Sequence, residues 1–371
     1  MKDDRIGVGV IGASTDGTWG GQAHLPALDA LPGFKTVAVS TTRQTSASET
    51  AERFAIPHAF TDPYELASHP DVDLVTIAVK VPEHDRLVRT ALQAGKHVYC
   101  EFPLGRTTEE AAGLLRAAEE RGVRHFAGLQ ARANPALAYV KDLLADGYVG
   151  DVLAVHCNYA LPLFPARSKQ IKQSRTYMLD ETNGANQFTI TAGHLLDGLT
   201  YLLGTFSDVS GILATQSERI KVVETGETVR ATSPDHVVVN AISANGAIVT
   251  AQIRNTYKGS LSIEINGTEG DLTLLSKENF MFQIDTFIVK GARGGEDFAE
   301  LPVPAQYDRP AASPLQPGPA FNVAQLYAQI YSDLLHNTNR APDFRTAAAV
   351  HELLDQVRKA AETGTARKIK R

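Results

Sequence analysis

The hydrophobic positions in the first third of the chain alternate between two spacings. Short runs rich in β-branched residues are followed by segments whose apolar residues recur at i, i+3, i+4 and i+7. Alternating strands and amphipathic helices are typical of a parallel sheet wound by right-handed crossovers. The expected strands are 7–12, 35–41, 73–79, 97–103 and 124–130, and the expected helices are 48–55, 83–95 and 109–122.

The pattern changes after residue 130. Long segments of strictly alternating apolar and polar residues favour a mostly antiparallel sheet with one solvated face. A proline-rich stretch at 301–320 predicts an irregular loop. The expected strands are 151–160, 236–244, 247–257, 261–268 and 270–276, and the expected helices are 135–147, 194–203, 322–336 and 345–363.

A chain of 371 residues is too long for one ordinary core. We therefore expect an α/β protein of two domains. Residues 1–130 form a Rossmann dinucleotide-binding domain, and 131–371 form an α/β domain with a large open, mostly antiparallel sheet. The second domain would bind substrate and support a dimer or tetramer, and its final helices could pack back on the first domain.

Composition narrows the class of protein. A net charge of −6 and a pI near 6.0 lack the basic excess that nucleic acid requires. No apolar run is long enough to span a bilayer, and no signal sequence opens the chain. Cys100 and Cys157 lie far apart, and no metal-ligand spacing occurs. We expect a cytoplasmic protein with two buried cysteines, without metal, and without nucleic-acid or membrane partners.

A literal G-x-G-x-x-G stands at Gly7, Gly9 and Gly12. In a Rossmann unit the glycines lie after the first strand, where the backbone approaches the pyrophosphate. Gly7 and Gly9 fall inside the expected strand, so that match is a coincidence. The cofactor loop instead starts at Gly12 and runs through Ser14 and Thr15 to Gly20 and beyond. A glycine-rich turn without a ligand is the alternative.

The end of the second strand bears on the choice of cofactor. NAD-preferring sites place an acid there to accept the ribose 2′-hydroxyl. This chain has Ser40, Thr41, Thr42 and Arg43 instead. Hydroxyls and a guanidinium suit a 2′-phosphate, so NADP(H) is favoured over NAD(H). A solvated surface role for Arg43 is the alternative.

Several motifs together resemble a known family. They are "HLPAL" after the glycine loop, "CEFPLG", "GLQARANPAL", "GYVGDV", "GHLLDGL" and "NGTEGDL". They resemble the glucose-fructose oxidoreductase/inositol dehydrogenase/MocA (Gfo/Idh/MocA) family along nearly the whole chain. The long glycine loop with Trp19 and the stretch "TYMLDETNGANQFTITAGHLLD" are most similar to the Gal80-like branch.

The resemblance implies hydride transfer between nicotinamide and a carbinol carbon, often of a sugar or cyclitol. The family's usual catalytic set is the lysine of E-K-P and the Asp and His of D-x-G-x-H. Here Glu101 and Pro103 match, but Phe102 replaces the lysine. His194 matches the histidine, whereas Ile190 replaces the aspartate.

His194 is therefore the candidate for the general base in oxidation, since an imidazole titrates near neutral pH. A packing or capping role for His194 is the alternative. Lys80 and Tyr177 are candidates to assist it, with Tyr159 and Asp180 on the substrate side. The residues expected to line the cofactor further along the sheet are Val79, Lys80, His84, Glu101, Phe102, Pro103, Gln130 and Arg132. His84 could equally satisfy backbone groups at a helix start.

Three functions fit these residues. The first is an NADP(H)-dependent oxidoreductase of a small polar, sugar-like substrate. The second is a Gal80-like regulator that binds NADP(H), turns nothing over and acts through a protein partner. The third is redox-neutral chemistry with transient oxidation by a bound cofactor.

Overall fold

The computed structural model describes residues 5–162, 168–278, 281–309 and 315–369. The chain divides into two compact units, 1–133 with 308–349 and 134–307 with 350–371. The first boundary lies close to the one expected at residue 130. Residues 308–349, however, belong to the first unit and not to a continuous second domain. Part of the loop expected at 301–320, residues 310–314, lies outside the described residues.

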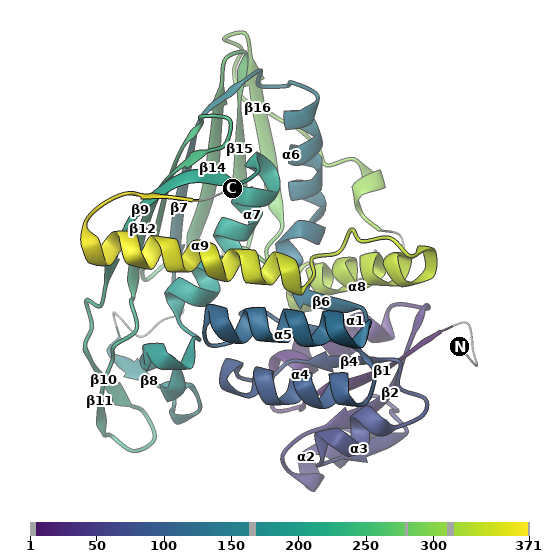
Figure 1. Cartoon of the computed structure of the whole chain (residues 1–371). Coiled ribbons are helices and arrows are strands. Elements are labelled where there is room, and N and C mark those ends of the chain that lie inside the picture. The colour runs from purple at the N-terminus through teal and green to yellow at the C-terminus, as the bar shows by residue number, and fades with distance from the viewer. Residues whose placement is uncertain (1–4, 163–167, 279–280, 310–314, 370–371) are drawn as a thin grey trace. The chain divides into compact units, whose positions relative to one another are not determined.

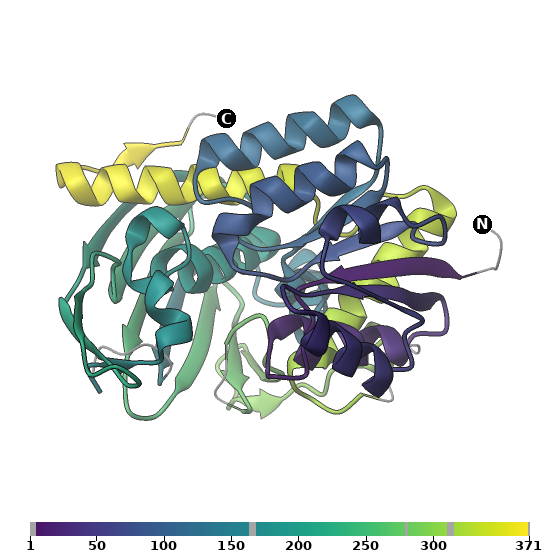
Figure 2. The same ribbon diagram turned by 90° about the horizontal axis from the view of Figure 1, so that it is seen from below.

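The first unit is built on a six-stranded sheet whose neighbouring strands all run parallel. The strand order is β3-β2-β1-β4-β5-β6, as in dinucleotide-binding Rossmann folds. Figures 1 and 2 show these strands side by side in purple and blue. The strands are β1 (Ile6–Ile11), β2 (Phe34–Ser40), β3 (His58–Phe60), β4 (Leu74–Ile77), β5 (His97–Glu101) and β6 (His125–Gly128).

Helices cover both faces of this sheet. Right-handed crossovers that proceed in opposite directions from β1 place their helices on opposite faces. α3, α4 and α5 pack in a row, while α8 packs against α1. The helices are α1 (Leu25–Asp29), α2 (Gln44–Arg53), α3 (Pro63–Ser68), α4 (His84–Gln93), α5 (Thr108–Arg121), α8 (Pro319–His336) and the start of α9 (Phe344–Thr363). Short turns are η1 (Gly20–His24), η2 (Val81–Glu83) and η3 (Gln130–Ala133).

The second unit contains a nine-stranded sheet in the order β17-β16-β15-β14-β7-β13-β12-β9-β18. Among the described strands, β7 and β13 pair in parallel and every other neighbouring pair is antiparallel. The predicted fold class is confirmed. The strands are β7 (Val152–Leu161), β9 (Phe206–Ala214), β12 (His236–Ser243), β13 (Ile248–Asn255), β14 (Ser260–Gly267), β15 (Gly270–Ser276), β16 (Phe287–Arg293), β17 (Ala299–Glu300) and β18 (Arg367–Lys368).

One face of the nine-stranded sheet carries helices and the other is open. α6 (Pro135–Ala145) packs against β16 and against α7 (Gly193–Leu203). The open face exposes apolar side chains, among them Ile212 and Ile248. A small separate sheet holds β8 (Gln170–Ile171), β10 (Arg219–Val222) and β11 (Thr228–Arg230). The remaining turns are η4 (Gln173–Leu179), η5 (Glu181–Asn183), η6 (Gln187–Ala192) and η7 (Ala305–Tyr307).

Candidate functional site

Parallel neighbours β1 and β2 bring two loops to the same edge of the Rossmann sheet. Ile11 pairs with Ser40 in the strand register, so the loops that follow these residues leave the sheet together. Gly7 and Gly9 lie inside β1, as predicted, so they are strand residues and not part of the loop that follows β1. Ligands of open α/β sheets bind beyond the carboxyl ends of the strands. The loops after β1 and β2 are thus the first part of the candidate site.

The glycine loop is shaped so that only backbone fits at its two ends. Gly12 has φ +93°, and a Cβ there would lie 2.4 Å from Cγ1 of Val79 and 2.5 Å from the carbonyl oxygen of Ala78. At Gly20, a Cβ would lie 2.9 Å from the Cα of Ala13. Such close packing of bare backbone is what a pyrophosphate-binding turn requires.

Hydroxyls inside the loop hold its conformation. The backbone N–H of Ser14 donates to Oγ1 of Thr18 at 2.8 Å, and that hydroxyl donates to the Ser14 carbonyl at 3.1 Å. The Ser14 hydroxyl in turn accepts from the N–H of Asp16. Ser14 is buried and Thr15 half-buried, so the role of Ser14 in the free protein is to shape the turn. Contact of either hydroxyl with a phosphate stays a prediction.

Trp19 and Gln130 each carry a buried polar atom that lacks a hydrogen-bond partner within the part of the chain that the structure describes. These atoms are Nε1 of Trp19, a donor, and Oε1 of Gln130, an acceptor. An unsatisfied buried polar group costs free energy unless a ligand or water satisfies it. Together with the glycine turn, the two atoms fit a polar, amide-bearing cofactor such as a nicotinamide dinucleotide.

The loop after β2 divides into buried and exposed positions. Ser40 is buried, and the Thr41 hydroxyl lies 2.7 Å from the Ser46 hydroxyl and donates to the Arg43 carbonyl at 2.9 Å. Thr42 and Arg43 are exposed. The Arg43 guanidinium donates from Nη2 to Oδ2 of Asp16 at 3.3 Å. Arg43 is thus placed to bind an anionic group between the two loops, beside a carboxylate that the sequence reasoning overlooked.

His84 lies at the start of α4 and contacts two backbone carbonyls. Its ring is buried, with Nδ1 2.9 Å from the Pro103 carbonyl and Nε2 3.1 Å from the Val79 carbonyl. Burial lowers the pKa of His84. Both nitrogens lie near backbone carbonyls, which favours the alternative that His84 satisfies backbone groups at a helix start, and its contact with a cofactor stays a prediction. His84 ties together the loops after β4 and β5, including the predicted cofactor residues Val79 and Pro103.

The depressed pKa of His84 makes stability depend on pH. As pH falls through the ordinary histidine range, the unfolded chain takes up a proton that the folded chain resists, so stability is lost on acidification. The slope for one such group is at most about 1.4 kcal/mol per pH unit. We expect His84→Gln to reduce the loss between about pH 7 and pH 5, measured by urea unfolding at each pH. The same change at the exposed His336 should leave the slope unaltered.

A buried chain of hydrogen bonds lies behind the matched E-x-P residues. The Glu101 carboxylate is 3.0 Å from Nε2 of His24 and accepts from Nε2 of Gln130 at 2.7 Å. Because a carboxylate only accepts, the proton of His24 belongs on Nε2. When the ring is neutral, Nδ1 then accepts from the Tyr327 hydroxyl at 2.9 Å. The Tyr327 oxygen lies 2.8 Å from the Thr76 hydroxyl.

This chain of contacts fixes Glu101 and, with it, the adjoining Phe102. Phe102 itself is 5% exposed. A buried, apolar ring thus occupies the position of the lysine in the E-K-P motif, where a charged side chain would need solvent or a carboxylate to stabilise it. Lys80 is exposed at the start of η2, and Arg132 is half-buried in η3. Their contacts with a cofactor or substrate stay predictions.

His194 lies on α7 in the second unit. It is 2% exposed, and Asp197, one turn further on, is fully buried. The helix is preceded by η6, a π-helical turn whose N-cap is Asn186. The Asn186 side chain accepts from the N–H groups of Phe188 and Thr189 and forms a capping box. This cap fixes the start of the segment that presents His194.

The other substrate-side candidates differ in their surroundings. Tyr159 is fully buried in β7, and its hydroxyl accepts from the Phe282 N–H at 2.7 Å. Strand alternation turns Tyr159 into the core, which favours a structural role, and its contact with a substrate stays a prediction. Tyr177 is half-buried, and burial raises its pKa. Asp180 caps η5 by accepting from the Thr182 N–H. Roles for Tyr177 and Asp180 stay predictions.

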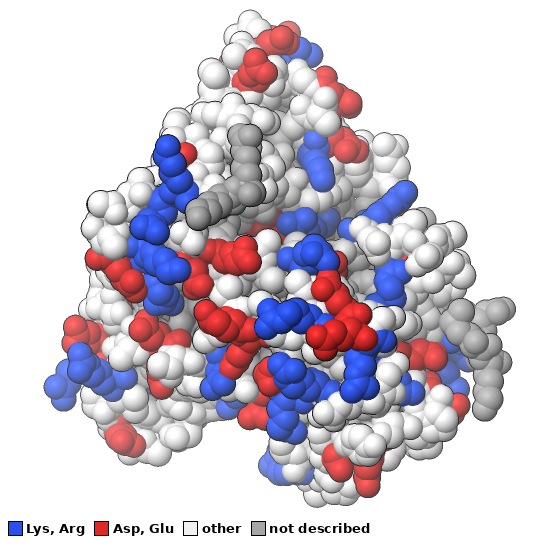
Figure 3. Space-filling model, in the orientation of Figure 1, with Lys and Arg blue, Asp and Glu red and all other residues white. Residues whose placement is uncertain are grey.

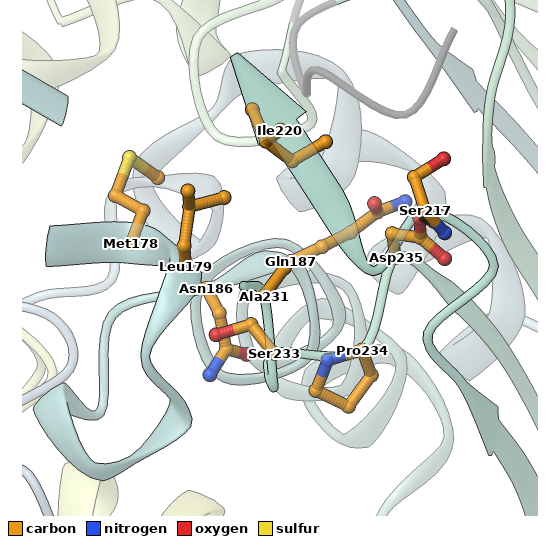
Figure 4. A pocket seen from close by; sticks show the side chains of 10 residues that line it. All are labelled: Met178, Leu179, Asn186, Gln187, Ser217, Ile220, Ala231, Ser233, Pro234 and Asp235. Carbon is orange, nitrogen blue, oxygen red and sulfur yellow. Dashed lines mark hydrogen bonds between the residues drawn. The ribbon is translucent and has the colours of Figure 1, made fainter. Parts of the chain in front are cut away.

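A small pocket opens beside the start of η6 (Figure 4). Within the described residues, Nδ2 of Asn186, Nε2 of Gln187 and Oγ of Ser233 are buried without a hydrogen-bond partner. Such orphaned groups are satisfied by ordered water or by a polar group of a ligand. Sequence reasoning missed these residues, although the Asn186–Thr189 spacing is that of a capping box. The pocket is lined by Met178, Leu179, Asn186, Gln187, Ser217, Ile220, Ala231, Ser233, Pro234 and Asp235.

Comparison with known families agrees with this geometry. Residues 6–129 match the model of the GFO_IDH_MocA oxidoreductase family, NAD-binding Rossmann fold. Residues 135–276 match the model of the Gal80p C-terminal domain. The predicted resemblance to the Gfo/Idh/MocA family and its Gal80-like branch is confirmed. Phe102 and Ile190 are the positions at which the sequence departs from the catalytic pattern that this resemblance implies.

Curated relatives include both enzymes and regulators. Dehydrogenase aclE of Aspergillus oryzae is 35% identical over 55% of this chain and 56% of its own length. The galactose/lactose metabolism regulatory protein GAL80 of Kluyveromyces lactis is 25% identical over 74% of this chain and 65% of its own. The chain thus spans less than two thirds of either relative. Levoglucosan dehydrogenase of Pseudarthrobacter phenanthrenivorans is 28% identical over 72% of this chain and 73% of its own.

Solved structures share the fold over the full chain. A super-repressor mutant of Gal80p from Saccharomyces cerevisiae has a TM-score of 0.85 at 23% identity, covering 98% of both chains. Levoglucosan dehydrogenase in complex with NADH and L-sorbose has a TM-score of 0.84 at 22% identity, covering 100% of both. At these identities the likeness establishes the fold alone.

Both cysteines are buried, as expected, and burial raises their pKa values. The described residues include no metal-type cluster of three or more His, Cys, Asp or Glu. None of the described helices is long and apolar enough to cross a membrane. On the face in Figure 3, charges of both signs are interspersed, without the single-sign stripe that nucleic acid binding favours.

Proposed function

We propose that the chain is an NAD(P)-dependent oxidoreductase that favours NADP(H). It would transfer a hydride to or from a carbinol or carbonyl carbon of a small polar, sugar-like substrate. The observation that carries the proposal is the backbone-only turn at Gly12 and Gly20, with the orphaned Nε1 of Trp19 in the same loop. When bound, the nicotinamide would supply the hydride acceptor or donor that no side chain can provide.

In this proposal, the chain's own residues hold the cofactor and move the proton. Gly12 to Gly20 would take the pyrophosphate, and Arg43 the 2′-phosphate. His194 would accept the hydroxyl proton in oxidation and return it in reduction. Lys80 and Tyr177 are the remaining proton-handling candidates. Phe102 would shape the pocket without taking part in proton transfer.

The substrate class rests on the relatives. Levoglucosan dehydrogenase and inositol 2-dehydrogenase are both named for hydroxyl-rich cyclic substrates. A polyhydroxylated ring offers a secondary carbinol to a histidine base. We propose the same class of substrate for this chain, and a homo-oligomer formed through the open face of the nine-stranded sheet.

A Gal80-like regulator is the second candidate. It is favoured by the loss of two proton-handling positions, at Phe102 and Ile190, and by the match of 135–276 to the Gal80p C-terminal domain. Such a protein would bind NADP(H) and act through a protein partner. Any steady turnover by the unaltered chain would remove this alternative.

Cofactor binding can be followed through the chain's single tryptophan, Trp19. Because Trp19 lies in the proposed cofactor loop, bound NADPH should quench the tryptophan emission and accept excitation energy from it. Both signals should saturate as NADPH is added. The same titration with Trp19→Phe provides the blank, and calorimetry checks that this variant still binds. Unchanged emission with no heat of binding would refute cofactor binding.

Arg43→Ala is expected to weaken NADPH binding about tenfold and to spare NADH, because a charge-assisted contact to the 2′-phosphate would be lost. Dissociation constants for both cofactors come from the Trp19 titration. The matched control is Arg86→Ala, since Arg86 is an exposed arginine on α4 that pairs with Glu83. If NADH affinity fell as far as NADPH affinity, the assignment of Arg43 to the 2′-phosphate would be wrong.

A further inference from the structure

The glycine loop and the loop after β2 are joined by one ion pair. Oδ2 of Asp16 lies 3.3 Å from Nη2 of Arg43, and the two side chains are 63% and 69% exposed. The residues come from loops that leave adjacent parallel strands at the same edge of the sheet. In this fold the ribose next to adenine lies at that edge, close to the end of the second strand.

Asp16 changes the electrostatics inferred from the sequence. The strand-end segment 40–43 contains no acid, which is why a 2′-phosphate was expected to meet only hydroxyls and a guanidinium. In the folded chain, Asp16 supplies a carboxylate to the same place from the preceding loop. A 2′-phosphate would have to share Arg43 with this carboxylate and would be repelled by it.

The pair contributes little to the fold. Exposed ion pairs are worth about 0–1 kcal/mol and often nothing measurable. The Asp16 carboxylate is also not needed to shape the loop. Within the loop, Asp16 contacts the Ser14 hydroxyl through its backbone N–H. Its side chain can therefore be altered without disturbing the glycine turn.

We propose that Asp16 is a specificity-determining residue that limits the preference for NADP(H) over NAD(H). Its carboxylate competes with the 2′-phosphate of NADP(H) for Arg43. The ribose of NAD(H) carries no 2′-phosphate, so the carboxylate does not repel it. The inference rests on the proposed function, because it presupposes that the chain binds a nicotinamide dinucleotide.

The test replaces Asp16 by asparagine, which keeps the shape and removes the charge. NADPH should bind about five- to tenfold more tightly to Asp16→Asn, and NADH should bind no more tightly than to the parent. The gain should shrink in about 0.5 M salt, because exposed charges are screened. Asp85→Asn is the matched control, since Asp85 forms a similar exposed pair with Arg89 on α4.

The outcomes separate this inference from the function beneath it. A parent chain that binds neither cofactor would overturn both the proposed function and the role of Asp16. A parent that binds cofactor, with an Asp16→Asn affinity for NADPH that is unchanged or lower, would overturn the role of Asp16 alone. An equal gain for NADH and NADPH would also overturn it, since discrimination requires a difference between the two.

Discussion

Replacing His194 with alanine is expected to lower turnover by about 10²- to 10⁴-fold, the usual range for loss of a general base. NADPH affinity should change little. His194 is the one histidine or acid of the family's catalytic set that this chain keeps, and the capped η6 turn fixes the start of its helix. The measurement pairs kcat for the best substrate with the dissociation constant of NADPH.

A control separates chemistry from folding. His351 is another buried histidine of the second unit, on α9. His351→Ala should leave kcat within a few-fold of the parent once the folded fraction is taken into account. If the His194 and His351 variants lost turnover equally, or if His194→Ala lost cofactor affinity to the same extent, then His194 would have a structural role.

His24→Leu is expected to destabilise the first unit by about 2–4 kcal/mol. The leucine would leave the Glu101 carboxylate without the donor at Nε2 of His24 and the Tyr327 hydroxyl without its acceptor at Nδ1. Glu101 keeps its bond from Gln130 and is 12% exposed, so the expected loss stays below that of a wholly buried charge. The free energy of unfolding in urea measures the effect.

Tyr327→Phe is the graded comparison. It removes the hydroxyl that lies between His24 and Thr76 in the chain of hydrogen bonds and leaves the contact between His24 and Glu101 intact. We therefore expect a loss of about 1–2 kcal/mol in the free energy of unfolding. A His24→Leu protein as stable as the parent would mean that His24 only fills space. If both variants lost the same free energy of unfolding, the hydrogen bond of the Tyr327 hydroxyl would account for the effect, and not the contact between His24 and Glu101.

Much of the fold could be predicted because the spacing of apolar residues within each segment indicates its secondary structure. Alternating strands and helices predicted the parallel sheet, and Gly12 could be placed correctly since strand register separates it from Gly7 and Gly9. The short strands β3 and β8 and the π-helical turn η6 were missed, because two or three residues, or one irregular turn, leave no period to detect. The longer strands β9 and β16 were missed as well. The return of 308–349 to the first unit depends on packing between segments far apart in sequence.

The candidate site was less predictable for the same reason. The chain of bonds from His24 to Tyr327 joins residues 303 positions apart, and nothing local to either residue signals it. Asp16 was overlooked because NAD-type acids are sought at the end of β2, whereas this one arrives from the loop after β1. For Tyr159, the sequence indicated a residue type suited to a substrate site, and only the fold shows that its side chain lies on the buried face of the sheet.

The most direct test of the oxidoreductase function is absorbance at 340 nm. Purified protein would be incubated with NADP⁺ or NADPH and a panel of sugars, polyols and keto-sugars, with His194→Ala in parallel. The proposed function predicts a steady, substrate-dependent change for the parent that is lost in the variant. Saturable NADPH binding without turnover on any substrate of the panel would contradict it and favour a regulator of the Gal80 type.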